Sequence, residues 1–183
     1  MIATTYSRLA PKHRLAAWVR LLAVTASGVA PEYRGVTIGR ARQGDGIAVA
    51  TVPPLMADVD SRRAFARSRL ALLVDLYDRA LCGPLPIACK ATAAYARVVR
   101  SGGDADAAAR EAWEGTYNWP GEADEPEHAL AFGRGLSFDD LCREDPRDDE
   151  RGPGWEPGER TRFGRYAARL WTDLLDAERV EER

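Results

Sequence analysis

The residues best suited to chemistry form a basic knot near the N-terminus, in the stretch TTYSRLAPKHRLAAWVRLLA. Arg8, Lys12, His13 and Arg14 lie where a short polar-apolar run leads into an apolar helix. Three interpretations are open: a catalytic centre, a contact to nucleic-acid phosphate, or the solvated start of a helix. Phosphate contacts by Arg and Lys add salt-dependent affinity without reading sequence. An ordinary helix-start surface is the favoured interpretation, and a catalytic centre is the least favoured.

A second basic group begins an expected long helix. Arg62, Arg63, Arg67 and Arg69 crowd its first turns, where the helix dipole favours acids. Plain solvation is the more common role of such arginines, and a binding face is the alternative interpretation. We also expect a docking surface on the last helix. The candidate nucleic-acid or partner contacts are Arg8, Lys12, Arg14, Arg62, Arg63, Arg67 and Trp171.

Most catalytic motifs are absent from the sequence. No GxxxxGK[ST], GxSxG or HExxH pattern occurs, and Gly133-Arg134-Gly135 lacks the third glycine of a dinucleotide fingerprint. The 2 histidines and 3 cysteines show no ligand spacing and no CxxC pair, which favours reduced thiols over disulfides or a zinc site. We therefore expect no catalytic residue, no cofactor and no metal.

The PD-(D/E)xK pattern of metal-dependent nucleases is also incomplete. That chemistry needs an acid two residues before a lysine, so that carboxylates hold Mg²⁺ and the ammonium assists the attacking water. The residue two positions before Lys12 is Ala10, and the residue two positions before Lys90 is Ala88, so neither lysine completes the motif. Tyr6 lies where such a site would begin, but its neighbours offer no carboxylate.

Composition and charge favour a soluble, globular, cytoplasmic chain. Apolar residues make up 45% and charged residues 30% of 183 residues, and no apolar run reaches the ~20 residues of a membrane span. The net charge of −2 hides a split: residues 1–100 carry 15 Lys and Arg against 6 Asp and Glu, and residues 101–183 carry 11 against 22. The basic half suits phosphate or an acidic partner, and the acidic half would repel nucleic acid. The alternative of equal weight is that both halves are only solvated surface.

The apolar spacing predicts one strand, a helix, a hairpin, and then helices. We expect a strand over residues 3–8 and a helix that starts at Pro11 and ends at Gly28 and Pro31. GVTIGRA and GIAVATV predict a hairpin, followed by a helix of about twenty residues capped by Asp58 or Asp60. Further helices are expected over residues 90–100, 104–114 and, with apolar spacing from Phe163 to Leu174, near the end.

These elements predict an α/β (α+β) fold with a small mixed sheet and helices. The first strand, helix and second strand form a right-handed crossover with a parallel strand pair. The expected organisation is a domain over residues 1–143, a flexible linker loop over 144–158 and a C-terminal helix over 159–183 that packs on the same domain. Trp113, Tyr117 and Trp119 are expected to pin an irregular loop to the core.

Four stretches resemble the C-terminal region of RecC, the gamma subunit of exodeoxyribonuclease V (RecBCD), in an actinobacterial version. They are YSRLAPKHRLAAWVRLLAVTA, the VTIGRA hairpin, DLYDRALCGPLPIACKATAAYA and RFGRYAARLW. The resemblance implies a degenerate PD-(D/E)xK nuclease-like fold with a C-terminal helical extension and no catalytic residues. It also implies RecB and RecD as partners, DNA as an open further contact, and neither a membrane nor a small-molecule substrate. RecC chains are far longer, so we expect a fragment with an unpaired sheet edge at residues 3–8 or at the hairpin.

Three functions follow as alternatives. The favoured one is a non-catalytic scaffold domain of a DNA-repair helicase–nuclease, with the acidic half and the last helix as docking surfaces. The second is a stand-alone nucleic-acid-binding module that uses the basic half. The third is a nuclease that obtains its metal ligands from a partner.

Overall fold

The computed structural model describes residues 1–30 and 32–183, and the chain forms two compact units. Unit 1 comprises Met1–Asp78 with Leu174–Arg183, and unit 2 comprises Arg79–Asp173. These boundaries differ from the expected ones at residues 143 and 158. The predicted role of Pro31 in ending the first helix lies outside the described residues.

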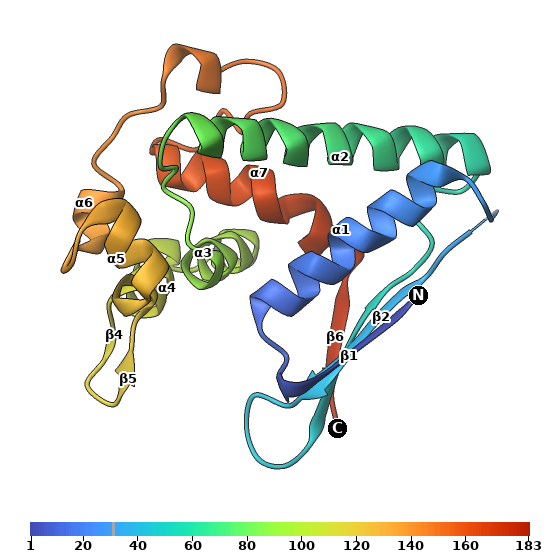
Figure 1. Ribbon diagram of the computed structural model, residues 1–183, viewed down its shortest axis with the longest axis horizontal. Helices are drawn as coiled ribbons and strands as arrows, with labels where there is room; N and C mark the ends of the chain where they lie inside the picture. The colour runs from blue at the N-terminus through green and yellow to red at the C-terminus, as the bar shows by residue number, and fades with distance from the viewer. Residues whose placement is uncertain (31) are drawn as a thin grey trace. The chain divides into compact units, whose positions relative to one another are not determined.

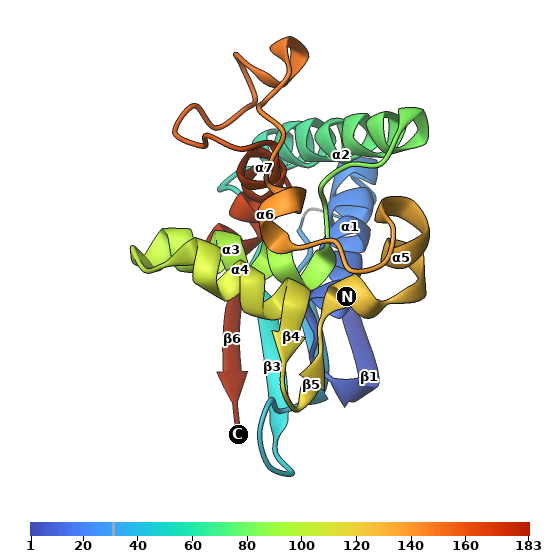
Figure 2. The same ribbon diagram turned by 90° about the vertical axis from the view of Figure 1, so that its left-hand side faces the viewer.

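Unit 1 is built on a four-stranded mixed sheet of order β1-β2-β3-β6 (Figure 1 and Figure 2). β1 pairs with β2 in parallel, as the predicted crossover requires, and β2–β3 is the predicted antiparallel hairpin. The fourth strand was not expected: the last helix ends at Ala177, and the chain then pairs antiparallel with β3. The strands are β1 (Ile2–Arg8), β2 (Gly35–Arg40), β3 (Ile47–Val52) and β6 (Arg179–Glu182).

Helix α1 (Pro11–Ser27) covers one face of this sheet. Pro11 occupies its first position, where a missing N–H costs nothing. Trp18 and Leu21 are buried and border the same small cavity as Thr37 and Ala50 of the sheet. The helix ends as predicted at Gly28, whose φ of 68° is the left-handed conformation that favours glycine.

Helix α2 (Val59–Cys82) begins at one of the two predicted caps. The Oδ1 atom of Asp58 accepts a hydrogen bond from the Ser61 backbone N–H at 2.9 Å. Hydrogen bonds from the Ser61 side chain and backbone lower the pKa of Asp58 below its ordinary value. An ionised carboxylate at this position also suits the helix dipole, so Asp58 fixes the start of the helix.

Unit 2 is mainly helical, with one short hairpin. Its core joins Ala91 of α3, Trp113 of α4 and Phe163 of α7, all at most 1% exposed. Phe138 and Phe163 meet edge to face at 5.1 Å between ring centroids. The elements are α3 (Cys89–Ser101), α4 (Ala105–Glu114), β4 (Gly115–Thr116), β5 (Trp119–Pro120), η1 (Glu122–Asp124), α5 (Pro126–Phe132), α6 (Phe138–Leu141), η2 (Asp148–Glu150) and α7 (Arg162–Ala177).

The observed class is mixed α/β, with seven α-helices and a small mixed sheet among the described residues. This confirms the coarse fold prediction. In the described part of the chain, no helix is both long and apolar enough to span a bilayer.

Candidate partner and nucleic-acid contact sites

The basic knot at the start of α1 divides into exposed and engaged side chains. Arg8 and Lys12 are exposed at the end of β1 and in the first turn of α1. His13 Nδ1 accepts a hydrogen bond from the Ala10 backbone N–H at 3.3 Å, and its Nε2 lies 3.4 Å from Ser7 Oγ. His13 therefore helps to cap the helix.

Arg14 faces the interior of unit 1 and not the solvent. Its Nε donates to Glu178 Oε2 at 2.8 Å, and its Nη2 contacts the same oxygen. Their side chains are 15% and 3% exposed, respectively. Because this ion pair ties α1 to the residue that precedes β6, the prediction of Arg14 as a contact residue needs correction: its guanidinium is already committed.

The arginines that begin α2 also differ from one another. Arg62 Nε and Nη2 donate to the carbonyls of Met56 and Ala57 at 3.0 and 2.7 Å, so Arg62 stabilises the preceding turn. Arg63 is half-buried beside Gly28, the C-cap of α1. Arg67 is exposed, which leaves it as the accessible member of the three.

The predicted contact residue Trp171 is wrong as a surface residue. Its side chain is 0% exposed, and its Nε1 donates to Thr92 Oγ1 at 2.9 Å. The Thr92 hydroxyl in turn donates to the Ala88 carbonyl at 2.6 Å. Trp171 therefore fixes α7 to α3 inside unit 2.

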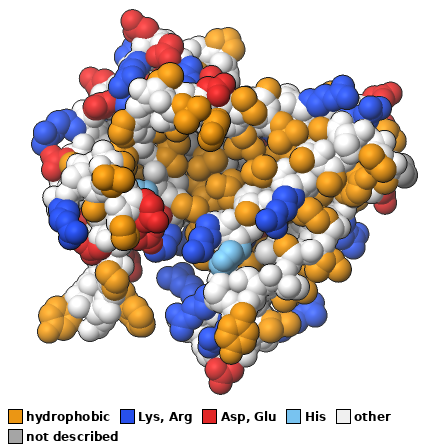
Figure 3. Space-filling model, in the orientation of Figure 1, with side chains coloured by type: hydrophobic (Ala, Val, Ile, Leu, Met, Phe, Trp, Pro, Cys, Tyr) orange, Lys and Arg blue, Asp and Glu red, His pale blue; other side chains and the backbone are white. Residues whose placement is uncertain are grey.

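The accessible aromatic residues lie instead on the β4–β5 hairpin. Tyr117 is 103% and Trp119 71% exposed, whereas Trp113 is 1% exposed. Of the three aromatics expected to pin this loop, only Trp113 does so, through a 2.8 Å hydrogen bond from Nε1 to the Leu136 carbonyl. Figure 3 shows hydrophobic side chains at the projecting tip of the hairpin. Residues 111–133 include 6 acids and no Lys or Arg, so this tip lies in an acidic segment.

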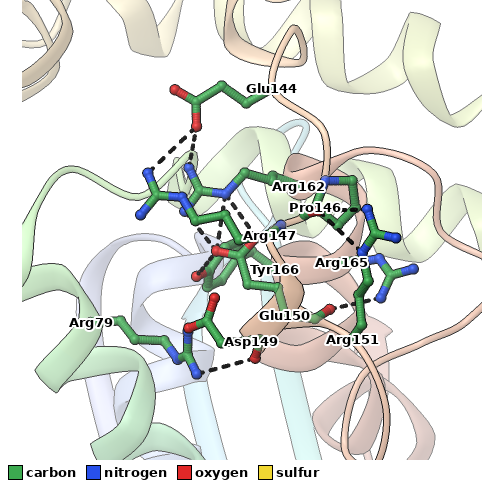
Figure 4. A network of polar contacts seen from close by, with 10 residues as sticks. All are labelled: Arg79, Glu144, Pro146, Arg147, Asp149, Glu150, Arg151, Arg162, Arg165 and Tyr166. Atoms are coloured by element: carbon green, nitrogen blue, oxygen red, sulfur yellow. Dashed lines mark hydrogen bonds and ion pairs between the residues drawn. The ribbon is translucent and has the colours of Figure 1, made fainter.

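A buried ion pair organises the segment predicted as a linker loop (Figure 4). Arg162 Nε donates to Glu150 Oε2 at 2.8 Å and Nη2 to Oε1 at 2.7 Å, and both residues are at most 3% exposed. Tyr166 donates its hydroxyl proton to Glu150 Oε1 at 2.7 Å, and the Arg147 N–H donates to Oε2 at 3.0 Å. Burial alone would raise the pKa of Glu150, but the hydrogen bonds from Arg162, Tyr166 and Arg147 lower it to about 2.

The same segment is held at its other end by Trp155. The Arg169 guanidinium lies 4.0 Å and that of Arg79 5.3 Å from the Trp155 ring centroid. Tyr166 packs edge to face against the same ring at 5.2 Å. Cation–π and aromatic contacts of this kind anchor a loop without regular secondary structure.

A third cluster joins two carboxylates and a histidine. Potential ligand atoms of Glu122, Glu125 and His128 all lie within 4.8 Å of one another, a set that could hold a divalent cation. Yet Glu122 already accepts hydrogen bonds from the Lys90 and Ala91 backbone N–H groups at 2.8 and 2.9 Å. Lys90 Nζ contacts Glu125, and a cation would have to displace it.

The pKa of Glu122 reflects both its burial and its contacts with the start of α3. Burial raises the pKa of Glu122, and the hydrogen bonds from the start of α3 partly offset that rise. The hydrogen bond to Glu125 raises the pKa of Lys90. The expectation that neither histidine is joined to cysteine or carboxylate at ligand spacing is wrong for His128. The spacing E-x2-E-x2-H over residues 122–128 is the sequence signal that could have found this set.

Comparison with known proteins identifies the family of this chain. The RecC C-terminal domain family matches residues 1–100, more than half of the chain, and the chain belongs to this family. Over 177 residues, 97% of the chain, it is 37% identical to the RecBCD enzyme subunit RecC of Mycobacterium tuberculosis, in strains CDC 1551 / Oshkosh and H37Rv. Over 180 residues, it is 35% identical to the subunit of the same name from Mycolicibacterium smegmatis.

These matches confirm the predicted resemblance to actinobacterial RecC. The chain spans about 15% of the length of the curated relatives it matches. No solved structure gives a significant match.

Proposed function

We propose that this chain acts as a non-catalytic domain of a RecC subunit in a RecBCD-type helicase–nuclease, exodeoxyribonuclease V. The single observation that carries the proposal is the match to RecBCD subunit RecC over 97% of the chain. The role would be subunit scaffolding and DNA handling in double-strand break repair and homologous recombination. The proposed partners are RecB- and RecD-type subunits in the cytoplasm, and DNA remains a further candidate contact.

Residues on three strands of the sheet support the proposed lack of nuclease chemistry in a nuclease-like fold. The strands β1, β2 and β3 contain no Asp or Glu. Lys12 is exposed, and Lys90 is committed to Glu125, so neither lysine stands beside a pair of free carboxylates. A Mg²⁺-dependent nuclease needs such a pair to hold the ion and activate water.

The acidic hairpin supports a scaffolding surface. Tyr and Trp are enriched among residues that dominate binding energy at protein interfaces, and Tyr117 and Trp119 are exposed together. Their acidic surroundings suit a basic partner protein better than DNA. Trp171 is buried and cannot form the docking surface of the acidic half. We therefore assign that docking role to the β4–β5 hairpin.

Co-purification tests the proposal. We expect a tagged version of this chain to retain RecB- and RecD-type subunits of the same organism, and the variant with Tyr117→Ala and Trp119→Ala to retain less. The control variant Tyr77→Ala truncates another exposed aromatic and should retain both. Deleting residues 159–183 would be a poor test, because it removes Phe163 and Trp171 from the core. Failure of the intact chain to retain either subunit would contradict the proposal.

A stand-alone nucleic-acid module is the second candidate, favoured by the exposed Arg8 and Lys12. It predicts DNA binding by the isolated chain that weakens steeply with salt, since each neutralised phosphate releases counterions. The scaffold proposal predicts weak binding of this kind at most.

A further inference from the structure

The face of the unit 1 sheet opposite α1 is apolar and open. Strand pairing sets Ile2, Val36 and Thr51 in one row and Thr4, Ile38 and Val49 in the next, because paired residues point to the same side. Arg40 and Ile47 are paired in the third row. The alternating exposure of β1 places Tyr6 on this same face.

Side-chain exposure distinguishes the two faces clearly. Under α1, Thr37 is 6% and Ala50 2% exposed. On the opposite face, Ile2 is 73%, Tyr6 92% and Ile47 48% exposed, and the more central Val36, Ile38 and Val49 are half-buried. A sheet face rich in Ile and Val is stable when another layer covers it, and a contiguous open apolar patch marks an interaction site.

The margin of this open face is basic. Arg8 and Arg40 are register partners on β1 and β2, and Arg179 pairs with Thr51 at the opposite corner. Among the described residues, none of these three guanidiniums forms an ion pair. In the part of the chain that the structure describes, the one acid on this face is Glu181, which is paired with Arg183 at 2.9 Å. An occupant with carboxylates beside its apolar stripe would therefore complement both the centre and the margin.

We propose that this open face is the docking site of an amphipathic, acid-flanked helix from a part of the RecC-type polypeptide outside residues 1–183. Four strands about 4.8 Å apart make a face about 15 Å wide, which holds one helix of about 10 Å diameter. The curated relatives have most of their length outside the segment that this chain matches, which is 15% of each. DNA fits less well, because Ile and Val offer no ring for base stacking and Tyr6 stands alone.

The inference goes beyond the proposed function, because a helix of the same polypeptide would cover the open sheet face whether or not RecB and RecD bind. Cysteine labelling tests it in two proteins. Tyr6→Cys and Ile47→Cys report on the open face, and Asp45→Cys, in the exposed β2–β3 turn, is the control; native cysteines are replaced in every variant. The same changes are made at the aligned positions of full-length Mycobacterium tuberculosis RecC, and the rate of maleimide modification is measured in both.

In the 183-residue chain we expect all three positions to react rapidly. In full-length RecC without other subunits, the two face positions should react at least about tenfold more slowly than in the short chain, because a covered side chain reacts only when the interface opens. The control position should keep its rate. Equal rates in both proteins would overturn the inference. Slowing that requires added RecB, RecD or single-stranded DNA would also overturn it, by assigning the face to a different occupant.

Discussion

Arg162 and Glu150 form a bidentate ion pair in the interior of unit 2, with Nε–Oε2 and Nη2–Oε1 distances of 2.8 and 2.7 Å. Glu150 ends the η2 turn and Arg162 begins α7, so the pair closes the intervening loop. Tyr166 and the Arg147 N–H satisfy further lone pairs of the carboxylate. A buried ion pair of this kind is costly to break, and here Arg162 would keep only its second ion pair, with Glu144.

Glu150→Gln should destabilise the fold by about 1.5–3 kcal/mol, because it removes the buried carboxylate partner of Arg162 and leaves the guanidinium only its ion pair with the more exposed Glu144. Chemical denaturation measures the free energy of unfolding. Glu156→Gln changes an exposed carboxylate in the same loop and should lie within about 0.5 kcal/mol of the parent chain. Equal stabilities of the two variants would contradict the role assigned to the pair.

The pH dependence of stability should report on the same carboxylate. The pKa of Glu150 falls from an ordinary value of 4.5 to about 2 on folding. Because the pKa of this carboxyl is lower in the folded state, its ionised form stabilises the fold at every pH above the unfolded pKa of about 4.5. This contribution is lost as the pH falls from about 4.5 toward 2. The full loss is about 3 kcal/mol. Measuring the free energy of unfolding against pH for the parent chain and for Glu150→Gln isolates the contribution of this carboxylate. If the two free energies changed with pH in parallel, the lowered pKa assigned to Glu150 would be contradicted.

Gly28→Ala should destabilise unit 1 more than Gly102→Ala destabilises unit 2. Both glycines end helices in the left-handed region, with φ of 68° and 70°, which costs alanine about 1 kcal/mol. A Cβ at Gly28 would also lie 2.5 Å from Arg63 Nε, whereas at Gly102 it would meet nothing within 4 Å. Thermal unfolding of both variants measures the difference, and adding Arg63→Ala to Gly28→Ala should recover part of it. Equal losses would rule out the contact with Arg63.

Trp171→Phe should cost about 1–3 kcal/mol, because it removes the donor to Thr92 Oγ1 in a buried site. Trp119→Phe is the matched control, since Trp119 is 71% exposed and donates no hydrogen bond to a described residue. Denaturant titration should place the control close to the parent chain. If Trp119→Phe were destabilised and Trp171→Phe were not, the assignment of Trp171 to the core and Trp119 to the surface would be wrong.

Local patterns in the sequence were sufficient to predict the first half of the fold. Pro11 and Gly28 bracket α1, and the two β-rich runs form the hairpin, because these features depend on neighbouring residues. β6 was missed, because Arg179, Glu181 and Glu182 lack the alternating apolar pattern of a half-buried strand. Pairing with β3 stabilises this strand, and no pattern in the neighbouring sequence predicts that pairing.

The candidate sites were harder to predict, because they depend on which charges and rings meet in space. Arg14 and Glu178 are 164 positions apart, and neither has a neighbour in sequence that indicates the pair. Trp171 and Trp119 have the same chemistry, but one is 0% and the other 71% exposed. Helical spacing around Trp171 does not distinguish a docking face from a core face, and tertiary packing decides between them.

ATP-dependent hydrolysis of linear duplex DNA tests the central claim most directly. The rate is compared for this chain alone, for RecB and RecD with a complete RecC-type subunit, and for the same assembly without the segment that matches this chain. We expect no hydrolysis by the chain alone with Mg²⁺ or Mn²⁺, full activity of the complete assembly, and a large loss without the segment. Metal-dependent cleavage by the chain alone, or undiminished activity of the shortened assembly, would contradict a non-catalytic scaffolding role.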